Sequence, residues 1–495
     1  MSAVKAAIHC LETGVPGLDE VLGGGLPEFS FNLIAGPPGS GKTTLAHQIM
    51  FALATPTRPA LYFTVLGEPP LKMLRYQQQF EFFDSEQVNT AISFINLADD
   101  TASGDLDRVL GRIVGEVEAH GPAAVFVDSF RSVMLAGQAD GKPFVDLQQF
   151  IQRLGMMMTS WQATTFLIGE YQSELDPSPV FTVADGLIWL RQSLQSNSVV
   201  RKMEIVKMRG QRTLPGLHTF RISAAGIQVF APAPVGAPSA LSAPQPIRAR
   251  LRMGVPELDR MMGGGLPRGY SLLVAGPSGS GKSIMATAFL AEGARSGETA
   301  VIAAFEQRSN VARGPVLADL IGTGRIGVVD TRAPDLSVEE ITRLLLTEIH
   351  RLKASRVVID SLSGFELALA PTFRDEFRES LARLVSSLVG TGASVLMTSE
   401  LEDRYTDLRF SPYGTAFMTD AIIVQRYIEV DSRLQRILAV VKLRGSDHSN
   451  ELRLFHIDAD GIKIGAMVAG REGLLGGQPS REQRKHAPDA GTGNA

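Results

Sequence analysis

The chain has 495 residues, enough for two to four domains of ordinary size. Its 44% hydrophobic and 20% charged residues are typical of globular proteins and exclude a chain that is disordered throughout. The net charge of -4 argues against a protein that grips nucleic acid or an anionic membrane through its overall charge. Cys10 is the single cysteine, which excludes an intramolecular disulfide. The sequence has no secretory signal and no apolar run of about 18 residues, so we expect a cytoplasmic protein without a membrane span.

Two stretches of the chain are copies of one another. Residues 14–44 read GVPGLDEVLGGGLPEFSFNLIAGPPGSGKTT and residues 254–284 read GVPELDRMMGGGLPRGYSLLVAGPSGSGKSI, with 18 of 31 aligned positions identical. A period this long indicates duplicated domains and not a solenoid. We predict domains over 8–230 and 248–465, a Pro/Ala-rich linker over 231–247 and a flexible tail over 466–495.

Within each copy, short apolar runs alternate with amphipathic stretches. In the first copy the runs are FNLIAG, ALYFTV, ISFINL, AVFVDS and TTFLIGE, and an amphipathic segment covers 105–119. This alternation predicts an α/β fold in which a mostly parallel sheet is flanked by helices. Residues 186–230 and 420–464 read as successive hairpin strands, so we expect them to extend each sheet antiparallel.

Each copy carries a phosphate-binding loop of the pattern G-x-x-x-x-G-K-[ST], placed between a predicted strand and a predicted helix. Glycines let the loop wrap so that its N–H groups face the phosphates, and the helix N-terminus adds a favourable dipole. Lysine is expected to reach the β- and γ-phosphates. The predicted ATP-binding residues are Gly36, Gly39, Ser40, Gly41, Lys42, Thr43, Thr44, Gly276, Gly279, Ser280, Gly281, Lys282, Ser283 and Ile284.

A nucleotide loop of this kind also needs an acid that holds Mg²⁺ through water. Asp128 and Asp360 end buried apolar runs at the expected place, although a strand-end Asp can also simply cap the next helix. With the hydroxyls of Thr43 and Ser283 they form the predicted magnesium sites. No NKxD-type guanine-recognition sequence occurs, so ATP is favoured over GTP as the ligand.

Several of these features together resemble one family. The TGVPGLDEVLGGGLP header, the phosphate loops, the Asp-Ser strand ends and the repeated KMRG and KLRG segments are similar to the double-domain KaiC branch of the RecA-like ATPases. The resemblance covers about residues 8–465. It implies RecA-like cores in a homo-oligomeric, hexameric ring, with ATP between subunits in both tiers and slow hydrolysis. In the circadian members the second tier also phosphorylates itself.

The resemblance also implies a catalytic base in each domain. The family has two adjacent glutamates after the second strand, one of which activates the attacking water. Here Gly67 takes the first place and Glu68 the second, whereas the other domain has Glu306 followed by Gln307. Each domain therefore keeps one carboxylate, and a general base needs only one within reach of the water.

The KMRG and KLRG segments supply the second implied group. In the family this Lys and Arg contact the γ-phosphate of the neighbouring subunit's nucleotide, which is an arginine-finger arrangement in trans. The matching residues are Lys207, Arg209, Lys442 and Arg444.

The phosphoacceptors of the circadian members are not retained. Their Ser-Thr pair precedes an I-T-D-T-I-like stretch, which here is Met418–Ile422, and the aligned positions are Ala416 and Phe417. Neither side chain has a hydroxyl. Thr415 and Thr419 are the nearby substitutes, so weak serine/threonine autokinase activity remains a possibility only on these two.

Three functions stay open on the sequence. The first is a ring ATPase that acts as a signalling or timing switch with an unknown regulatory protein as partner. The second is a scaffold held together by ATP with little turnover. The third is a RecA-type ATPase acting on single-stranded DNA. The loop after Glu170 has two acids and no Lys or Arg, and the loop after Glu400 has Arg404 and Arg409 against three acids. Neither is a convincing DNA channel.

Overall fold

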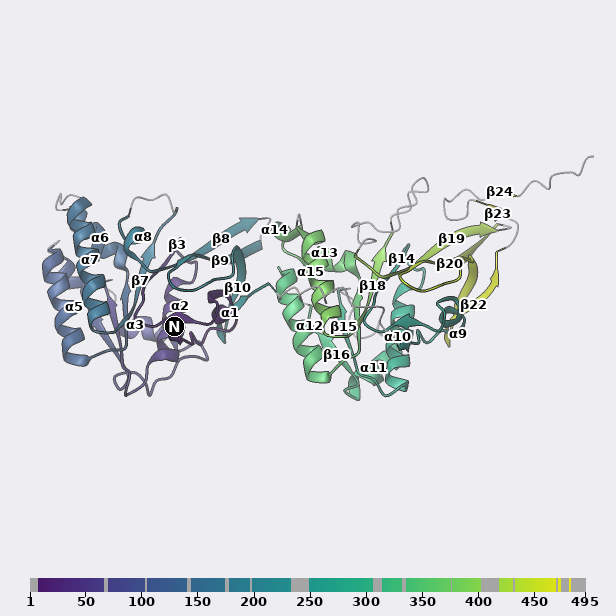
Figure 1. Cartoon of the computed structure of the whole chain (residues 1–495), viewed down its shortest axis with the longest axis horizontal. Coiled ribbons are helices and arrows are strands. Elements are labelled where there is room, and N and C mark those ends of the chain that lie inside the picture. Colours follow the sequence, from purple (N-terminus) through teal and green to yellow (C-terminus); the bar gives the residue numbers. More distant parts are fainter. Residues whose placement is uncertain are drawn as a thin grey trace, which may run out of the picture. The chain divides into compact units, whose positions relative to one another are not determined.

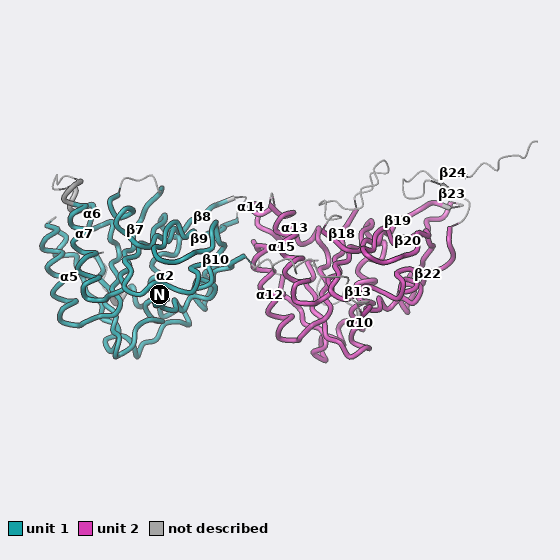
Figure 2. The backbone as a smooth tube through the Cα atoms, in the orientation of Figure 1, with its two compact units in different colours: residues 1–232 teal, residues 233–495 magenta. Residues whose placement is uncertain are grey.

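The computed structural model describes residues 8–65, 70–102, 105–139, 144–173, 178–195, 198–232, 249–305, 314–331, 335–374, 376–401, 418–430, 432–468, 471–472 and 480–481 (Figure 1). The chain divides into two compact units, residues 1–232 and 233–495 (Figure 2). The predicted linker lies almost entirely outside the described residues, as does most of the predicted tail. Among the described residues, no helix has the length and apolar character needed to cross a membrane.

The first unit is built on one nine-stranded sheet in the order β11-β10-β9-β8-β3-β7-β6-β4-β5. The strands are β3 (Phe31–Gly36), β4 (Ala60–Thr64), β5 (Ile92–Asn96), β6 (Ala124–Asp128), β7 (Thr164–Glu170), β8 (Gly186–Gln195), β9 (Ser198–Met208), β10 (Leu217–Ser223) and β11 (Gly226–Phe230). In the part of the sheet that runs β8-β3-β7-β6-β4-β5, all neighbouring strands are parallel. Strands β9, β10 and β11 add an antiparallel extension beyond β8. The predicted α/β class, the five predicted strands and the antiparallel extension are confirmed. β8 differs from the prediction for residues 186–230, because it pairs with β3 in parallel and only with β9 antiparallel.

Helices cover both faces of this sheet (Figure 1). Leu33 of β3 faces a core that helices from residues 106–160 complete, and the next residue, Ile34, faces a core that helices from residues 18–53 complete. This alternation follows from the two-residue period of a strand. The helices are α1 (Leu18–Leu22), α2 (Lys42–Leu53), α3 (Pro70–Gln77), α4 (Ala98–Thr101), α5 (Leu106–His120), α6 (Phe130–Ala139), α7 (Phe144–Ser160) and α8 (Val180–Val183).

The second unit repeats the architecture, with a sheet in the order β16-β15-β17-β18-β14-β19-β20-β21-β22. Its strands are β14 (Ser271–Gly276), β15 (Ala300–Ala304), β16 (Ile326–Val329), β17 (Arg356–Asp360), β18 (Ser394–Glu400), β19 (Ala421–Val430), β20 (Arg433–Leu443), β21 (Arg453–Asp458) and β22 (Gly461–Met467). Its helices are α9 (Pro256–Met261), α10 (Lys282–Arg295), α11 (Gly314–Gly322), α12 (Val338–Leu352), α13 (Leu362–Ala368), α14 (Pro371–Arg374) and α15 (Phe377–Gly390).

The repeated header forms a small antiparallel pair before each sheet. The pairs are β1 (Cys10–Leu11) with β2 (Leu26–Pro27) and β12 (Arg250–Leu251) with β13 (Leu266–Pro267). A further short pair, β23 (Arg471–Glu472) with β24 (Ser480–Arg481), follows the second sheet. A Cβ on Gly25 would lie 2.4 Å from the carbonyl oxygen of Leu11, and one on Gly265 would lie 2.3 Å from that of Leu251. The third glycine of each GGG run is therefore required for the close approach of the two strands.

Candidate functional sites at the phosphate loops

The phosphate loop of the first unit connects the buried strand β3 to helix α2. Gly41 precedes the helix with φ of 101°, and a Cβ there would lie 2.8 Å from Cδ1 of Ile222, so only glycine fits. Lys42 is the first residue of α2, and its Nζ donates a 2.8 Å hydrogen bond to the carbonyl oxygen of Pro37. This bond folds the lysine back over its own loop. Gly39 and Gly41 of the loop and the first residues of α2 line one pocket, and a helix N-terminus beside a glycine-rich loop suits a phosphate.

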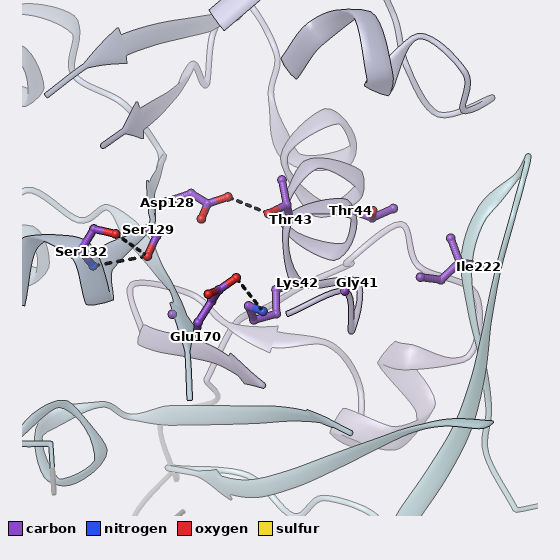
Figure 3. A pocket seen from close by; sticks show the side chains of 11 residues that line it. Gly41, Lys42, Thr43, Thr44, Asp128, Ser129, Ser132, Glu170 and Ile222 are labelled. Carbon is purple, nitrogen blue, oxygen red and sulfur yellow. Dashed lines mark hydrogen bonds and ion pairs between the residues drawn. The ribbon is translucent and has the colours of Figure 1, made fainter. Parts of the chain in front are cut away.

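A pocket of about 370 Å³ lies directly beside this loop (Figure 3). It is lined by Gly39, Gly41, Lys42, Thr43, Thr44, Asp128, Ser129, Ser132, Gly169, Glu170 and Ile222. The structure thus brings five of the predicted nucleotide-binding residues together with the predicted magnesium acid. Strands β3, β6 and β7 run parallel, so their carboxyl ends meet at one edge of the sheet.

Thr43 and Asp128 meet inside this pocket. The Thr43 hydroxyl donates a 2.8 Å hydrogen bond to Oδ2 of Asp128, and the Tyr62 hydroxyl donates a 2.7 Å bond to the same oxygen. Burial raises the pKa of Asp128, while the bonds from Tyr62 and Thr43 and the charge of Lys42 act in the opposite direction. Hydroxyl and carboxylate oxygens are the ligand types that Mg²⁺ takes. The pair therefore fits the predicted metal.

Lys42 shares the pocket with a carboxylate that the sequence did not single out as a site residue. Nζ of Lys42 lies 4.0 Å from Oε1 of Glu170, which ends β7 next to Gly36 (Figure 3). Burial lowers the pKa of Lys42, and the charges of Glu170 and Asp128 partly offset this effect. An anionic phosphate in the pocket would stabilise the charged lysine further.

The phosphate loop of the second unit follows β14 and has hydrogen-bond partners of its own. Nζ of Lys282 donates to the carbonyl oxygens of Gly276 at 2.9 Å and Pro277 at 2.8 Å. The Ser280 hydroxyl donates a 2.9 Å bond to Oε1 of Gln425, whereas Oδ1 of Asp360 accepts a bond from the Thr398 hydroxyl. Asp360 and Glu400 end β17 and β18 at the edge where the loop begins. Both predicted loops are thus placed at the carboxyl ends of parallel strands, where ligands bind in open α/β sheets.

The predicted trans Lys-Arg pairs lie at the other edge of each sheet. Met208 is paired with Gly186, and Gly186 is paired with Asn32 near the start of β3. Lys207 donates to the carbonyl oxygens of Thr182 and Ala184, and burial together with the charge of nearby Arg209 lowers its pKa.

The same placement holds in the second unit. Leu443 is paired with Ala421, and Ala421 is paired with Leu272 near the start of β14. Lys442 donates a 2.6 Å bond to the carbonyl oxygen of Thr419. Neither pair is brought near the phosphate loop of its own unit.

Some predicted residues cannot be placed. Glu68, Gly67, Glu306 and Gln307 lie outside the described residues, and so do Thr415, Ala416 and Phe417. Thr419 is described and completely buried.

Sequence reasoning missed several residues that hold the site. They are Tyr62, Thr398, Glu170, Asp185 and Asp420. Alignment of the two repeats could have pointed to Asp185 and Asp420, because both precede the strand that joins β3 or β14.

Comparisons with known proteins agree with this architecture. The family model "ATPase: KaiC" matches residues 11–233 and 251–468. The circadian clock oscillator protein KaiC of Picosynechococcus sp. is 27% identical over 497 residues, covering 97% of this chain and 94% of that protein. Circadian clock oscillator protein KaiC 1 of Synechocystis sp. is 27% identical over 96% of this chain and 93% of its own, and the protein of Rippkaea orientalis is 27% identical over 96% and 92%. With two RecA-like units, a phosphate loop in each and the family match over both, this chain belongs to the KaiC family of ATPases.

Proposed function

We propose that both domains hydrolyse ATP with Mg²⁺ at sites completed by a neighbouring copy of the chain, in the six-membered ring that the family resemblance implies. The observation that supports this is the separation of the two halves of each site. The phosphate loop begins at the carboxyl end of β3, whereas Arg209 lies at the amino end of the same strand. The equivalent separation divides the loop of the second domain from Arg444.

The separation is too large for one chain to close. Phe31 and Gly36 are five residues apart on a strand, which corresponds to about 16 Å at the usual rise. An arginine that neutralises charge on the transferred phosphoryl group must contact it. Arg209 can therefore serve only a nucleotide held by another copy, and subunit assembly then becomes linked to ATP binding.

Within one site, the roles follow from the contacts. The N–H groups of Gly39 and Gly41 and the start of α2 bind the β-phosphate, since Pro37 and Pro38 have no N–H to donate. Lys42 turns from Pro37 towards the γ-phosphate. Thr43 and Asp128 would hold Mg²⁺, which supplies charge neutralisation when bound. Among the described residues no three His, Cys, Asp or Glu side chains gather to hold a metal by themselves. This agrees with a metal that is shared with the phosphates of the nucleotide.

Turnover in this proposal depends on Glu68 and Glu306 as general bases. One carboxylate per domain is enough to take the proton of the attacking water. Each domain has lost one glutamate of the pair, the first at Gly67 and the second at Gln307, and this loss favours slow hydrolysis. A switch or timing role is proposed because the relatives are named circadian clock oscillator proteins.

Mixing two variants, each inactive in its first domain, tests the trans site. A subunit with Lys42→Ala still offers its Arg209, and a subunit with Arg209→Ala still offers its phosphate loop. Mixed rings should therefore hydrolyse ATP faster than the average of the two variants measured alone. As the matched control, the Lys42→Ala/Arg209→Ala double variant mixed with either single variant should give no excess. No excess from the first mixture, under conditions where labelled subunits exchange, would show that the finger does not act in trans.

The same assay distinguishes the proposed ATPase from the alternative functions. A scaffold that only binds ATP would assemble with nucleotide and show no excess turnover in any mixture, even though light scattering reports rings. If the protein instead binds labelled single-stranded DNA, with an affinity that falls as salt rises, the result would favour a RecA-type ATPase that acts on single-stranded DNA.

A further inference from the structure

An aspartate joins the trans arginine of each domain to the strand that carries the phosphate loop of the same domain. In the first unit, Oδ1 of Asp185 forms a 3.0 Å ion pair with Nη1 of Arg209, and Oδ2 accepts a 3.1 Å hydrogen bond from the backbone N–H of Phe31. The main chain makes the same connection, because Asp185 N donates to Phe31 O at 2.7 Å and Arg209 N donates to Asp185 O at 3.0 Å.

The second unit repeats this connection in detail. Oδ2 of Asp420 accepts bonds from the N–H and the hydroxyl of Ser271, both at 3.0 Å. Oδ1 of the same carboxylate lies 3.6 Å from Nη1 of Arg444. Asp420 N donates to Ser271 O at 3.0 Å, and Arg444 N donates to Asp420 O at 2.9 Å. The residue at the start of the strand differs, Phe31 against Ser271, but the aspartate and its two-sided contact are the same.

The contact restricts a side chain that would otherwise be mobile. The Arg209 side chain is 61% exposed and the Arg444 side chain 53% exposed, so packing does little to fix them. The aspartate side chains are only 30% and 24% exposed, and each is fixed by the backbone N–H on its other oxygen. A guanidinium held in this way loses less entropy when it meets a phosphate.

We infer that Asp185 and Asp420 are positioning residues that aim the arginine of one subunit at the neighbour's nucleotide and fix that arginine to the phosphate-loop strand of its own subunit. This inference rests on the proposed trans function. Its consequence is directional: the aspartate serves the site of the next subunit. A brace that only stabilises the start of β3 would instead affect the site of its own subunit.

The mixed-ring assay distinguishes these two directions. Asp185→Ala is added either to the Lys42→Ala subunit, which contributes only its arginine, or to the Arg209→Ala subunit, which contributes only its phosphate loop. In the first placement we expect the excess turnover to fall by about tenfold or more, because a misplaced catalytic group loses on this scale. In the second placement we expect the excess to stay within about twofold, because that subunit's arginine is already absent.

Two controls keep the assay informative. Glu204→Ala removes the acid of another ion pair on the same strands, Arg191 with Glu204 at 2.6 Å, and should lower the excess in neither placement. Asp185→Asn keeps an acceptor for Phe31 and a weaker one for Arg209, so it should restore part of the loss in the first placement.

Three results would overturn the inference, and they differ from each other. Equal losses in both placements, or a loss only in the second placement, would show a local brace and leave the trans function standing. No loss in either placement would show that Arg209 needs no anchor. No excess turnover even without the aspartate change would contradict the trans function itself, and the inference would fall with it.

Discussion

The hydroxyl of Tyr62 donates a 2.7 Å hydrogen bond to Oδ2 of Asp128, the acid beside the first phosphate loop. The second domain replaces this bond with one from Thr398 to Asp360. The exchange is reciprocal, because Ile302 stands at the place of Tyr62 and Ile168 at the place of Thr398. Asp128 is buried and Asp360 half-buried, and each domain supplies a hydrogen-bond donor from the strand on a different side of the acid.

Tyr62→Phe should weaken the magnesium site of the first domain without unfolding it. The change removes one of two hydroxyl donors from Asp128, which raises the pKa of that acid further and costs about 1 kcal/mol of stability. We expect the Mg²⁺ concentration for half-maximal turnover to rise by about threefold to tenfold. The measurement is made in the Lys282→Ala variant, in which the second domain is inactive and turnover reports on the first domain alone. Thr398→Val with Lys42→Ala should do the same in the second domain. An unchanged Mg²⁺ requirement in both would contradict the assigned role.

His47 should make the first domain sensitive to acid. It is completely buried, lies 4.6 Å from the Tyr62 ring between centroids, and burial lowers its pKa to about 4 from 6.5. Between these two pH values the unfolded chain binds a proton that the folded chain does not, so folding stability falls as the pH drops from about 6.5 towards 4. The full loss is on the order of 3 kcal/mol.

The measurement follows the unfolding transition of the first domain between pH 7.5 and 4.5. His47→Phe should flatten this dependence, because phenylalanine does not titrate. Thr287 occupies the equivalent place in the second domain, so Thr287→Phe is the matched control and should leave the pH dependence of that domain unchanged. An equally steep dependence after His47→Phe would rule out His47 as its source.

Arg356 should be a major contributor to the stability of the second domain. Its side chain is 2% exposed, pairs with Glu298 at 2.6 Å and donates to the carbonyl oxygens of Arg252 and Phe289. Removing the buried guanidinium leaves Glu298, which is 21% exposed, and two carbonyl oxygens without their donor, so Arg356→Ala should cost about 3–5 kcal/mol. Arg351→Ala breaks an exposed pair with Glu348 and should cost less than about 1 kcal/mol. Chemical denaturation compares them; similar losses would contradict the prediction.

The sequence was sufficient to predict the features that depend on local pattern. The repeat, the strand-loop-helix of residues 31–53 and the acids at 128 and 360 follow from spacing and residue type, and the structure confirms the elements. The parallel pairing of β8 with β3 could not be predicted, because hairpin-like spacing fixes only the pairing of β8 with β9. Which strand pairs with β8 on the side away from β9 depends on the packing of the whole sheet and its helices.

Contacts between segments that are far apart in the chain could not be predicted from the sequence either. Tyr62 and Asp128 are 66 residues apart, and Tyr62 alone reads as a buried aromatic of a strand. Asp185 meets Phe31 across 154 residues, so its role appears only when the sheet is assembled. In each case the residues next to the side chain in the sequence do not indicate its contact, which depends on the register of neighbouring strands.

Glu68 and Glu306 should matter for turnover more than for ATP binding. A general base acts in the transition state, so its loss lowers kcat while ground-state affinity stays close to that of the parent. We expect Glu68→Gln with Glu306→Gln to lower turnover by about 10²–10⁴-fold, and each single change to silence only its own domain. Fluorescent-nucleotide binding provides the control. Parent-like hydrolysis by the double variant would show that another group, such as Glu170, takes the proton.

Autophosphorylation of the second domain should be absent or confined to Thr415. An acceptor must bring a hydroxyl in line with the γ-phosphate, and Ala416 and Phe417 have none. Thr419 is completely buried, and its carbonyl oxygen binds Lys442, so its hydroxyl cannot reach a neighbour's nucleotide without local unfolding. We therefore expect phosphopeptide mapping after long incubation with ATP and Mg²⁺ to find no phosphate on Thr419. Stoichiometric phosphate on Thr415 that disappears with Glu306→Gln would show a kinase as well as an ATPase.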